Sequence, residues 1–141
     1  MKHHYLLAIL LISYSFASPA QQNSMLIGSG GGLTGMATVY KITPDGKVLK
    51  GKGIGEIKYT ECAKMKKAHA LNYLQSVSEQ TEATPKFDHP GNLYFFIGYA
   101  ENNSERKVTW GDMGNPVPES IQKLYQEINT TLNSIRFKPI K

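Results

Sequence analysis

Histidine, cysteine and a dense run of glycines are the residues of this 141-residue chain that could carry chemistry. His69 follows Cys62 by seven residues, in a segment whose composition predicts a helix. Two helical turns would place both side chains on one side of that helix, but about 10 Å apart. That separation is too large for a catalytic dyad or for a shared metal ion. We therefore expect no site from this pair.

Cys62 is the only cysteine of the chain, so it can form no internal disulfide. Its predicted position at the start of a helix could lower the pKa of its thiol through the helix dipole. The other interpretation is a small buried residue, because no partner for a reactive thiol is evident. Pairing with a cysteine of another molecule stays open.

Asp88 and His89, which precede a Pro-Gly pair, are the second candidate. They supply one carboxylate and one imidazole, which is an incomplete set of metal ligands. No pair of carboxylates has a spacing that indicates a general acid and a general base, and the G-x-S-x-G motif of serine hydrolases is absent. The sequence therefore predicts a protein that is not an enzyme and that carries no cofactor and no metal ion.

The glycine run at residues 28–35 has five glycines in eight positions and contains a formal G-x-G-x-x-G match. A dinucleotide site requires a helix directly after this motif, so that the pyrophosphate meets the N-terminus of that helix. Residues 36–43 instead alternate between two faces in the manner of a strand. No Lys-Ser or Lys-Thr pair follows the glycines, which excludes a P-loop. A nucleotide site is therefore not expected.

Two interpretations of the glycine run remain. It could be a bulge that shapes the sheet, or its bare backbone could be offered to a partner protein. Trp110 likewise could anchor a partner, or it could pack beneath the last helix. The candidate partner-binding residues are Gly30, Gly31, Gly32, Leu33, Thr34, Gly35 and Trp110.

The N-terminal segment has the pattern of a secretory signal peptide. A positive start is followed by an apolar stretch at 5–17, and small residues surround a cleavage position before Gln21. The apolar stretch is too short for a membrane span, and the alternative interpretation is a buried N-terminal helix. We expect a signal peptide at residues 1–20, a secreted or periplasmic protein, and no membrane association after cleavage.

The formal net charge of +5 comes from scattered basic residues. Only Lys64, Lys66 and Lys67 lie close together, and a solvated helix face explains them better than a nucleic-acid patch. We therefore expect a protein partner and no nucleic acid.

Hydrophobic periodicity predicts an α+β fold in one domain, residues 25–138. Short strands are expected at 25–27, 36–43 and 47–50, and a further short strand could lie at 56–59. A helix over 61–77 would start at Thr60 and turn Ala68, Leu71, Leu74 and Val77 inward. After a polar connection at 78–92, two strands at 93–100 and 106–110 would form a second hairpin.

The clearest helical pattern follows Pro118, with apolar residues spaced three or four apart. They are Ile121, Leu124, Tyr125, Ile128, Leu132 and Ile135. The predicted architecture is therefore a small antiparallel sheet of two hairpins with two helices packed on it, in the order β-β-β-α-β-β-α.

A short strand, then Gly31-Gly32-Leu33-Thr34-Gly35, then another strand resembles the start of the emfourin family. Emfourins are small protein inhibitors of thermolysin-like metallopeptidases. The later order, with a terminal helix led by Pro118, is also similar, and the resemblance covers roughly residues 25–135. The segments 50–59 and 78–92 depart from it.

The resemblance implies inhibition by occlusion, with the zinc ion belonging to the peptidase and the glycine loop as a contact. The alternative function is a secreted or periplasmic scaffold or interaction domain with neither inhibitory nor catalytic activity.

Overall fold

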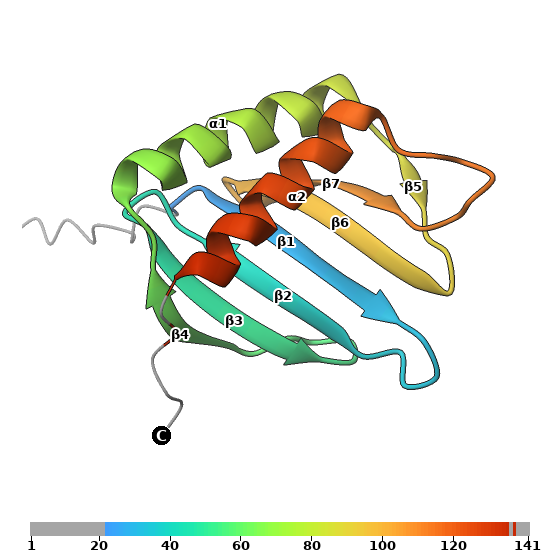
Figure 1. Cartoon of the computed structure of the whole chain (residues 1–141), viewed down its shortest axis with the longest axis horizontal. Coiled ribbons are helices and arrows are strands. Elements are labelled where there is room, and N and C mark those ends of the chain that lie inside the picture. Colours follow the sequence, from blue (N-terminus) through green and yellow to red (C-terminus); the bar gives the residue numbers. More distant parts are fainter. Residues whose placement is uncertain (1–21, 136, 138–141) are drawn as a thin grey trace, which may run out of the picture.

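The computed structural model describes residues 22–135 and 137, and these residues form one seven-stranded sheet with two helices on one of its faces (Figure 1). In chain order the elements are β1 (Ser24–Gly31), β2 (Ala37–Ile42), β3 (Lys47–Gly53), β4 (Tyr59–Lys64), α1 (Lys67–Ala83), β5 (Asp88–His89), β6 (Leu93–Glu101), β7 (Ser104–Trp110) and α2 (Glu119–Ser134). The strand order is β4-β3-β2-β1-β6-β7-β5, and every pair is antiparallel except β5 with β7.

The central strand β1 holds the sheet together, because it pairs with β2 on one side and with β6 on the other. Its pairing with β6 runs from Ser24 opposite Ala100 to Gly31 opposite Leu93. Half of the predicted glycine run therefore belongs to a strand. The expected strand at 25–27 is too short, and the turn begins only after Gly31.

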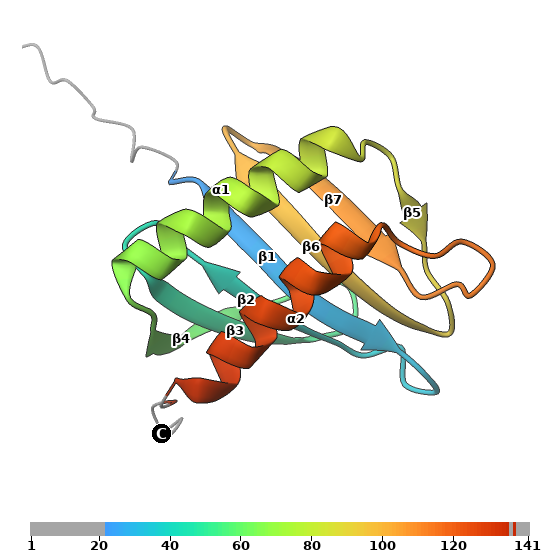
Figure 2. The ribbon, with the colours of Figure 1, turned by 45° about the horizontal axis from the view of Figure 1, so that its top comes forward.

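Both helices cover the same face of the sheet, as the turned view in Figure 2 also shows. Alternate residues of the strands point toward the helices, which is the two-residue period of a pleated sheet. Met25 and Ile27 of β1 meet Ile97 of β6 there, together with Ile121 and Ile128 of α2. All five side chains are buried, and burying each contributes about 1.5–3 kcal/mol.

The α+β class is confirmed, and so are two of the predicted elements. α2 follows Pro118, whose φ of −51° fits the position just before a helix, and it buries Ile121, Leu124, Ile128 and Leu132. The hairpin of β2 and β3 turns at Gly46, whose φ is +87°. The predicted sheet of two hairpins is wrong in detail, because all strands join in one sheet through the pairing of β1 with β6.

The predicted helix over 61–77 is wrong at its start. Residues 61–64 belong to β4 on the free edge of β3, and α1 begins at Lys67 instead of after Thr60. Helix propensity is a weak tendency, and hydrogen bonding to a neighbouring strand overrides it here. Residues Cys62 and Ala63 are both buried beside an irregularity in the pairing with β3.

The late start of α1 also changes which residues face inward. Ala70, Leu74, Val77 and Thr81 are buried, whereas Leu71 is 45% exposed. The expected connection at 78–92 contains the last turn and a half of α1 and the short strand β5. Thr81 is accommodated in the core because its hydroxyl donates to the carbonyl oxygen of Val77 at 2.8 Å.

The predicted signal peptide at 1–20 lies outside the described residues, as do most residues after 135. In the described part of the chain, neither helix combines the length and the apolar composition that a membrane crossing requires.

Candidate binding surface at the loop end

Four connections gather at one end of the sheet because the strands alternate in direction. β1 and β3 end there, β2, β4 and β6 begin there, and β7 ends there before the chain enters α2. We call this surface the loop end. It comprises the connections at residues 32–36, 54–58, 90–92 and 111–118, which run from the bottom to the right-hand side of Figure 1.

Large apolar side chains are exposed at the loop end to an unusual degree. Leu33 is 109% exposed, Met113 is 97% exposed and Leu93 is 60% exposed, and Met36 and Ile54 are exposed as well. Single exposed apolar residues are normal on any protein. Five such residues on one end, from three different connections and the start of β6, are typical of an interaction site.

The backbone of the glycine turn explains how Leu33 is presented. Gly31 has a φ of +99°, and a Cβ on it would lie 2.1 Å from the carbonyl oxygen of Asn92. The N–H of Gly32 donates to that same oxygen at 2.8 Å, and the N–H of Gly35 donates to the carbonyl oxygen of Gly32 at 3.2 Å. These bonds fix the turn to the neighbouring connection and leave Leu33 at its tip.

The glycines that precede the turn have a different role. Gly28 and Gly30 lie on the sheet face without helices, where they receive two aromatic side chains of β6. A Cβ on Gly28 would lie 2.6 Å from Cζ of Phe96, and a Cβ on Gly30 would lie 2.5 Å from the hydroxyl of Tyr94. Among the predicted contact residues, Gly30 and Gly31 are therefore needed for packing, whereas the 32–35 turn is available to a partner.

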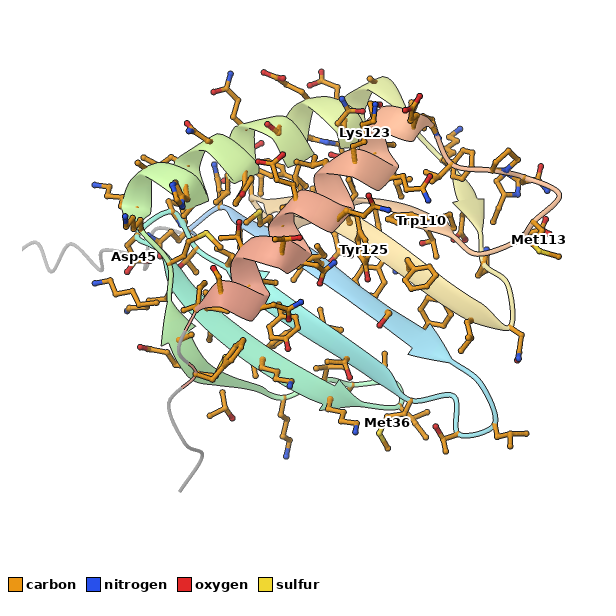
Figure 3. The ribbon with its side chains drawn as sticks, in the orientation of Figure 1. Met36, Asp45, Trp110, Met113, Lys123 and Tyr125 are labelled. Carbon is orange, nitrogen blue, oxygen red and sulfur yellow. The ribbon has the colours of Figure 1, made fainter. Side chains whose placement is uncertain are left out.

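Trp110, the other predicted contact residue, is only 8% exposed. Its ring centroid lies 5.1 Å from that of Tyr125 in an edge-to-face arrangement, and Phe95 lies against both rings. Figure 3 shows Trp110 and Tyr125 next to each other beneath α2. Trp110 also lines an open hollow of about 250 Å³ with residues of the 111–118 connection. Trp110 is therefore a buried residue that packs beneath the 111–118 connection of the loop end.

Tyr125 is a residue of this region that the sequence did not single out for function. Its hydroxyl donates to the carbonyl oxygen of Gly28 at 3.4 Å, which ties α2 to β1. Burial raises the pKa of Tyr125 above its ordinary value, so the hydroxyl stays protonated and able to donate.

The loop end carries little charge. The 32–36 and 90–92 connections have no charged residue, the 54–58 connection has Glu56 and Lys58, and the 111–118 connection has only Asp112. The carboxylate of Asp112 accepts from the side-chain amide of Asn115 at 2.6 Å and from the N–H of Gly114 at 3.0 Å. These two bonds lower the pKa of Asp112. The carboxylate stabilises its own loop, and the surface left for a partner is mainly apolar.

The residues that could have carried catalysis are dispersed. Cys62 is buried in β4, and burial raises the pKa of its thiol, whereas the predicted helix start would have lowered it. His69 lies against Tyr73 on α1, and His89 lies edge-on to Phe87. Among the described residues, no three His, Cys, Asp or Glu side chains form a group that could hold a metal ion.

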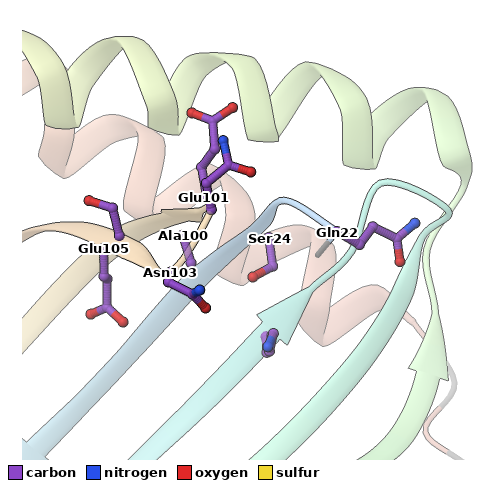
Figure 4. A pocket seen from close by; sticks show the side chains of 9 residues that line it. Gln22, Ser24, Ala100, Glu101, Asn103 and Glu105 are labelled. Carbon is purple, nitrogen blue, oxygen red and sulfur yellow. The ribbon is translucent and has the colours of Figure 1, made fainter. Parts of the chain in front are cut away.

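A polar hollow of about 230 Å³ lies at the opposite end of the sheet, beside the turn between β6 and β7 (Figure 4). Ser24, Lys41 and Glu105 are among the residues that line it. Figure 4 shows that the side chains of Glu101 and Glu105 point in different directions, so the two carboxylates do not converge on one point. This arrangement offers no acid–base pair.

The sequence matches no protein-family model. No curated protein matches it at a significant level.

Proposed function

We propose that this chain is an exported, non-catalytic binding protein that inserts its loop end into a cleft of a partner protein. The observation that carries the proposal is the gathering of Leu33, Leu93 and Met113 at one end of the sheet, all strongly exposed. Apolar side chains that project from loops on a rigid scaffold suit insertion into a pocket, because the scaffold has already fixed them in position.

The rigidity of the glycine turn supports insertion as the mode of binding. The turn is tied to Asn92 through Gly32 and is closed by the bond between Gly35 and Gly32. Little conformational entropy would then be lost when a partner closes around Leu33. The small side chains on either side of Leu33 would also let the backbone approach the walls of a narrow cleft.

The partner that we propose is a thermolysin-like metallopeptidase, blocked by occlusion of its substrate cleft. The resemblance of the glycine turn to that of the emfourins motivates this choice. Leu33 and Leu93 would supply apolar side chains to that cleft. The zinc ion would remain the peptidase's own. The turn consists of Gly, Leu and Thr, so it would contribute none of the usual zinc ligands.

Export is the second element of the proposal. The pattern of residues 1–20 is that of a signal peptide, which would bring the protein to the compartment where secreted peptidases act. A peptidase inhibitor made in the same cell would meet its target there.

The test is a titration of a panel of thermolysin-like peptidases with this protein, followed by measurement of residual peptidase activity. We expect stoichiometric loss of activity for at least one peptidase. Because the loop end carries only three charged residues, Glu56, Lys58 and Asp112, the inhibition should change less than about threefold between 50 mM and 500 mM salt. Full activity of every peptidase at a large excess of the protein would contradict the proposal. In that case a scaffold or interaction domain without inhibitory activity is the alternative.

A further inference from the structure

The face of the sheet that carries no helix has a hollow of its own. Two adjoining hollows, of about 310 and 280 Å³, share Val39, Ile57 and Phe96 as apolar lining. Their volumes lie near the lower limit for small-molecule sites. Gly35, Gly55 and Ile57 of the loop-end connections are among the residues that line them, but Leu33, Leu93 and Met113, which carry the proposed inhibitory function, are not.

Glycines and a folded-back segment create the larger hollow. Gly53, Gly55 and Gly35 leave space along its lining, and Ile57 folds back over Gly51 so closely that a Cβ there would lie 2.2 Å from the Cγ2 atom of Ile57. Phe96 forms the floor over Gly28 and is only 7% exposed. The result is an apolar trough with one wall from the connection between β3 and β4.

The polar groups that line the larger hollow can all donate hydrogen bonds. They are the ammonium group of Lys107 and the hydroxyls of Tyr94 and Thr109. Nζ of Lys107 lies 5.5 Å from the ring centroid of Phe96, directly above the apolar floor. Within the described residues Lys107 forms no ion pair with a carboxylate. Glu105 does not line this larger hollow, but it lines the adjoining one together with Lys107 and Tyr59.

We propose that this trough binds an alkyl monocarboxylate, such as a medium-chain fatty acid. The carboxylate would accept from Lys107 and from the two hydroxyls, and the alkyl chain would lie on Val39 and Phe96. A single cation above an apolar floor is complementary to one anionic head on an apolar tail. The inference is independent of the peptidase proposal, since each site can fail while the other holds.

Calorimetric titration with decanoate tests the proposal, with decanol and decyltrimethylammonium as probes of equal chain length. We expect saturable binding of one decanoate per chain, weaker binding of decanol and no binding of the cation. Lys107→Ala should weaken decanoate binding about 10–100-fold, which is the usual effect of a charged hydrogen-bonding group. Lys123→Ala, on the helix-covered side of the protein, is the matched control and should leave it unchanged.

Amide chemical shifts measured during the same titration locate the ligand without any substitution. They should move around Val39, Phe96 and Lys107. The proposal is overturned if decanoate gives no saturable binding, if decanol binds equally well, if Lys107→Ala binds decanoate like the unaltered protein, or if the shifts centre on Leu33 and Met113.

Discussion

Replacing Gly28 by alanine separates the two roles of the glycine run. The new Cβ would lie 2.6 Å from Cζ of Phe96 and 2.6 Å from the carbonyl oxygen of Thr38. Atoms do not approach this closely. Phe96 must therefore leave its position, and the backbone of the paired strand β2, which carries the Thr38 oxygen, must shift as well. Overpacking of this kind costs about 1–3 kcal/mol. We therefore expect Gly28→Ala to lower the free energy of unfolding by that amount.

Gly98→Ala is the matched control, because Gly98 lies on the same face of the neighbouring strand β6. Its new Cβ would have only ordinary contacts, the nearest at 3.4 Å from the carbonyl oxygen of Arg106. Gly98→Ala should be neutral, or stabilising by up to about 1 kcal/mol, since alanine restricts the unfolded chain. Urea unfolding measures both variants. Equal stability of Gly28→Ala and Gly98→Ala would refute the packing role assigned to Gly28.

Three further predictions concern single residues. Cys62 should react with a thiol reagent at least 100-fold more slowly in the folded protein than in urea, because burial shields the thiol and raises its pKa; comparable rates would contradict its placement. Trp110→Ala should reduce the free energy of unfolding by about 3–5 kcal/mol, the usual cost of removing a buried tryptophan; a change below about 1 kcal/mol would show that Trp110 is not in the core. The lowered pKa of Asp112 means that its contribution to stability is complete above the unfolded pKa of about 3.9 and is lost as the pH falls through the folded value. The stability difference between the unaltered protein and Asp112→Asn should therefore be constant above about pH 5 and shrink below about pH 4, and a difference independent of pH would refute this role.

The sequence was most informative where one local pattern decided the structure. The stripe from Ile121 to Leu132 predicts α2 because its spacing suits one buried helix face, and no strand could bury those residues together. The turn at Gly46 is similarly local, since a proline, an aspartate and a glycine define it within three residues.

The errors have a common physical origin, which is pairing between distant segments. Residues 59–64 contain good helix formers, but they form a strand because they pair with the free edge of β3. Gly28 and Gly30 appear to be turn residues until Phe96 and Tyr94 of β6 are placed beside them. The partners lie 68 residues apart for Gly28 and Phe96 and 64 residues apart for Gly30 and Tyr94, so a local pattern contains no sign of the contact.

The loop end shows the same limit for function. Leu33 was a predicted contact residue because it lies within the glycine turn, and the structure leaves it fully exposed. Leu93 and Met113 gave no local signal, because only the alternation of strand directions brings their connections to the same end as the glycine turn. A surface assembled from several connections becomes visible only after the sheet order is known.

Comparing Leu33→Asp with Leu71→Asp in peptidase inhibition tests the central claim most directly. Both leucines are exposed, but Leu71 lies on α1, away from the loop end. If the loop end enters the substrate cleft, Leu33→Asp should raise the inhibition constant at least 30-fold, the effect of losing an interface residue worth about 2 kcal/mol. Leu71→Asp should stay within twofold of the unaltered protein. Equal inhibition by the two variants, or no inhibition by the unaltered protein, would contradict the account.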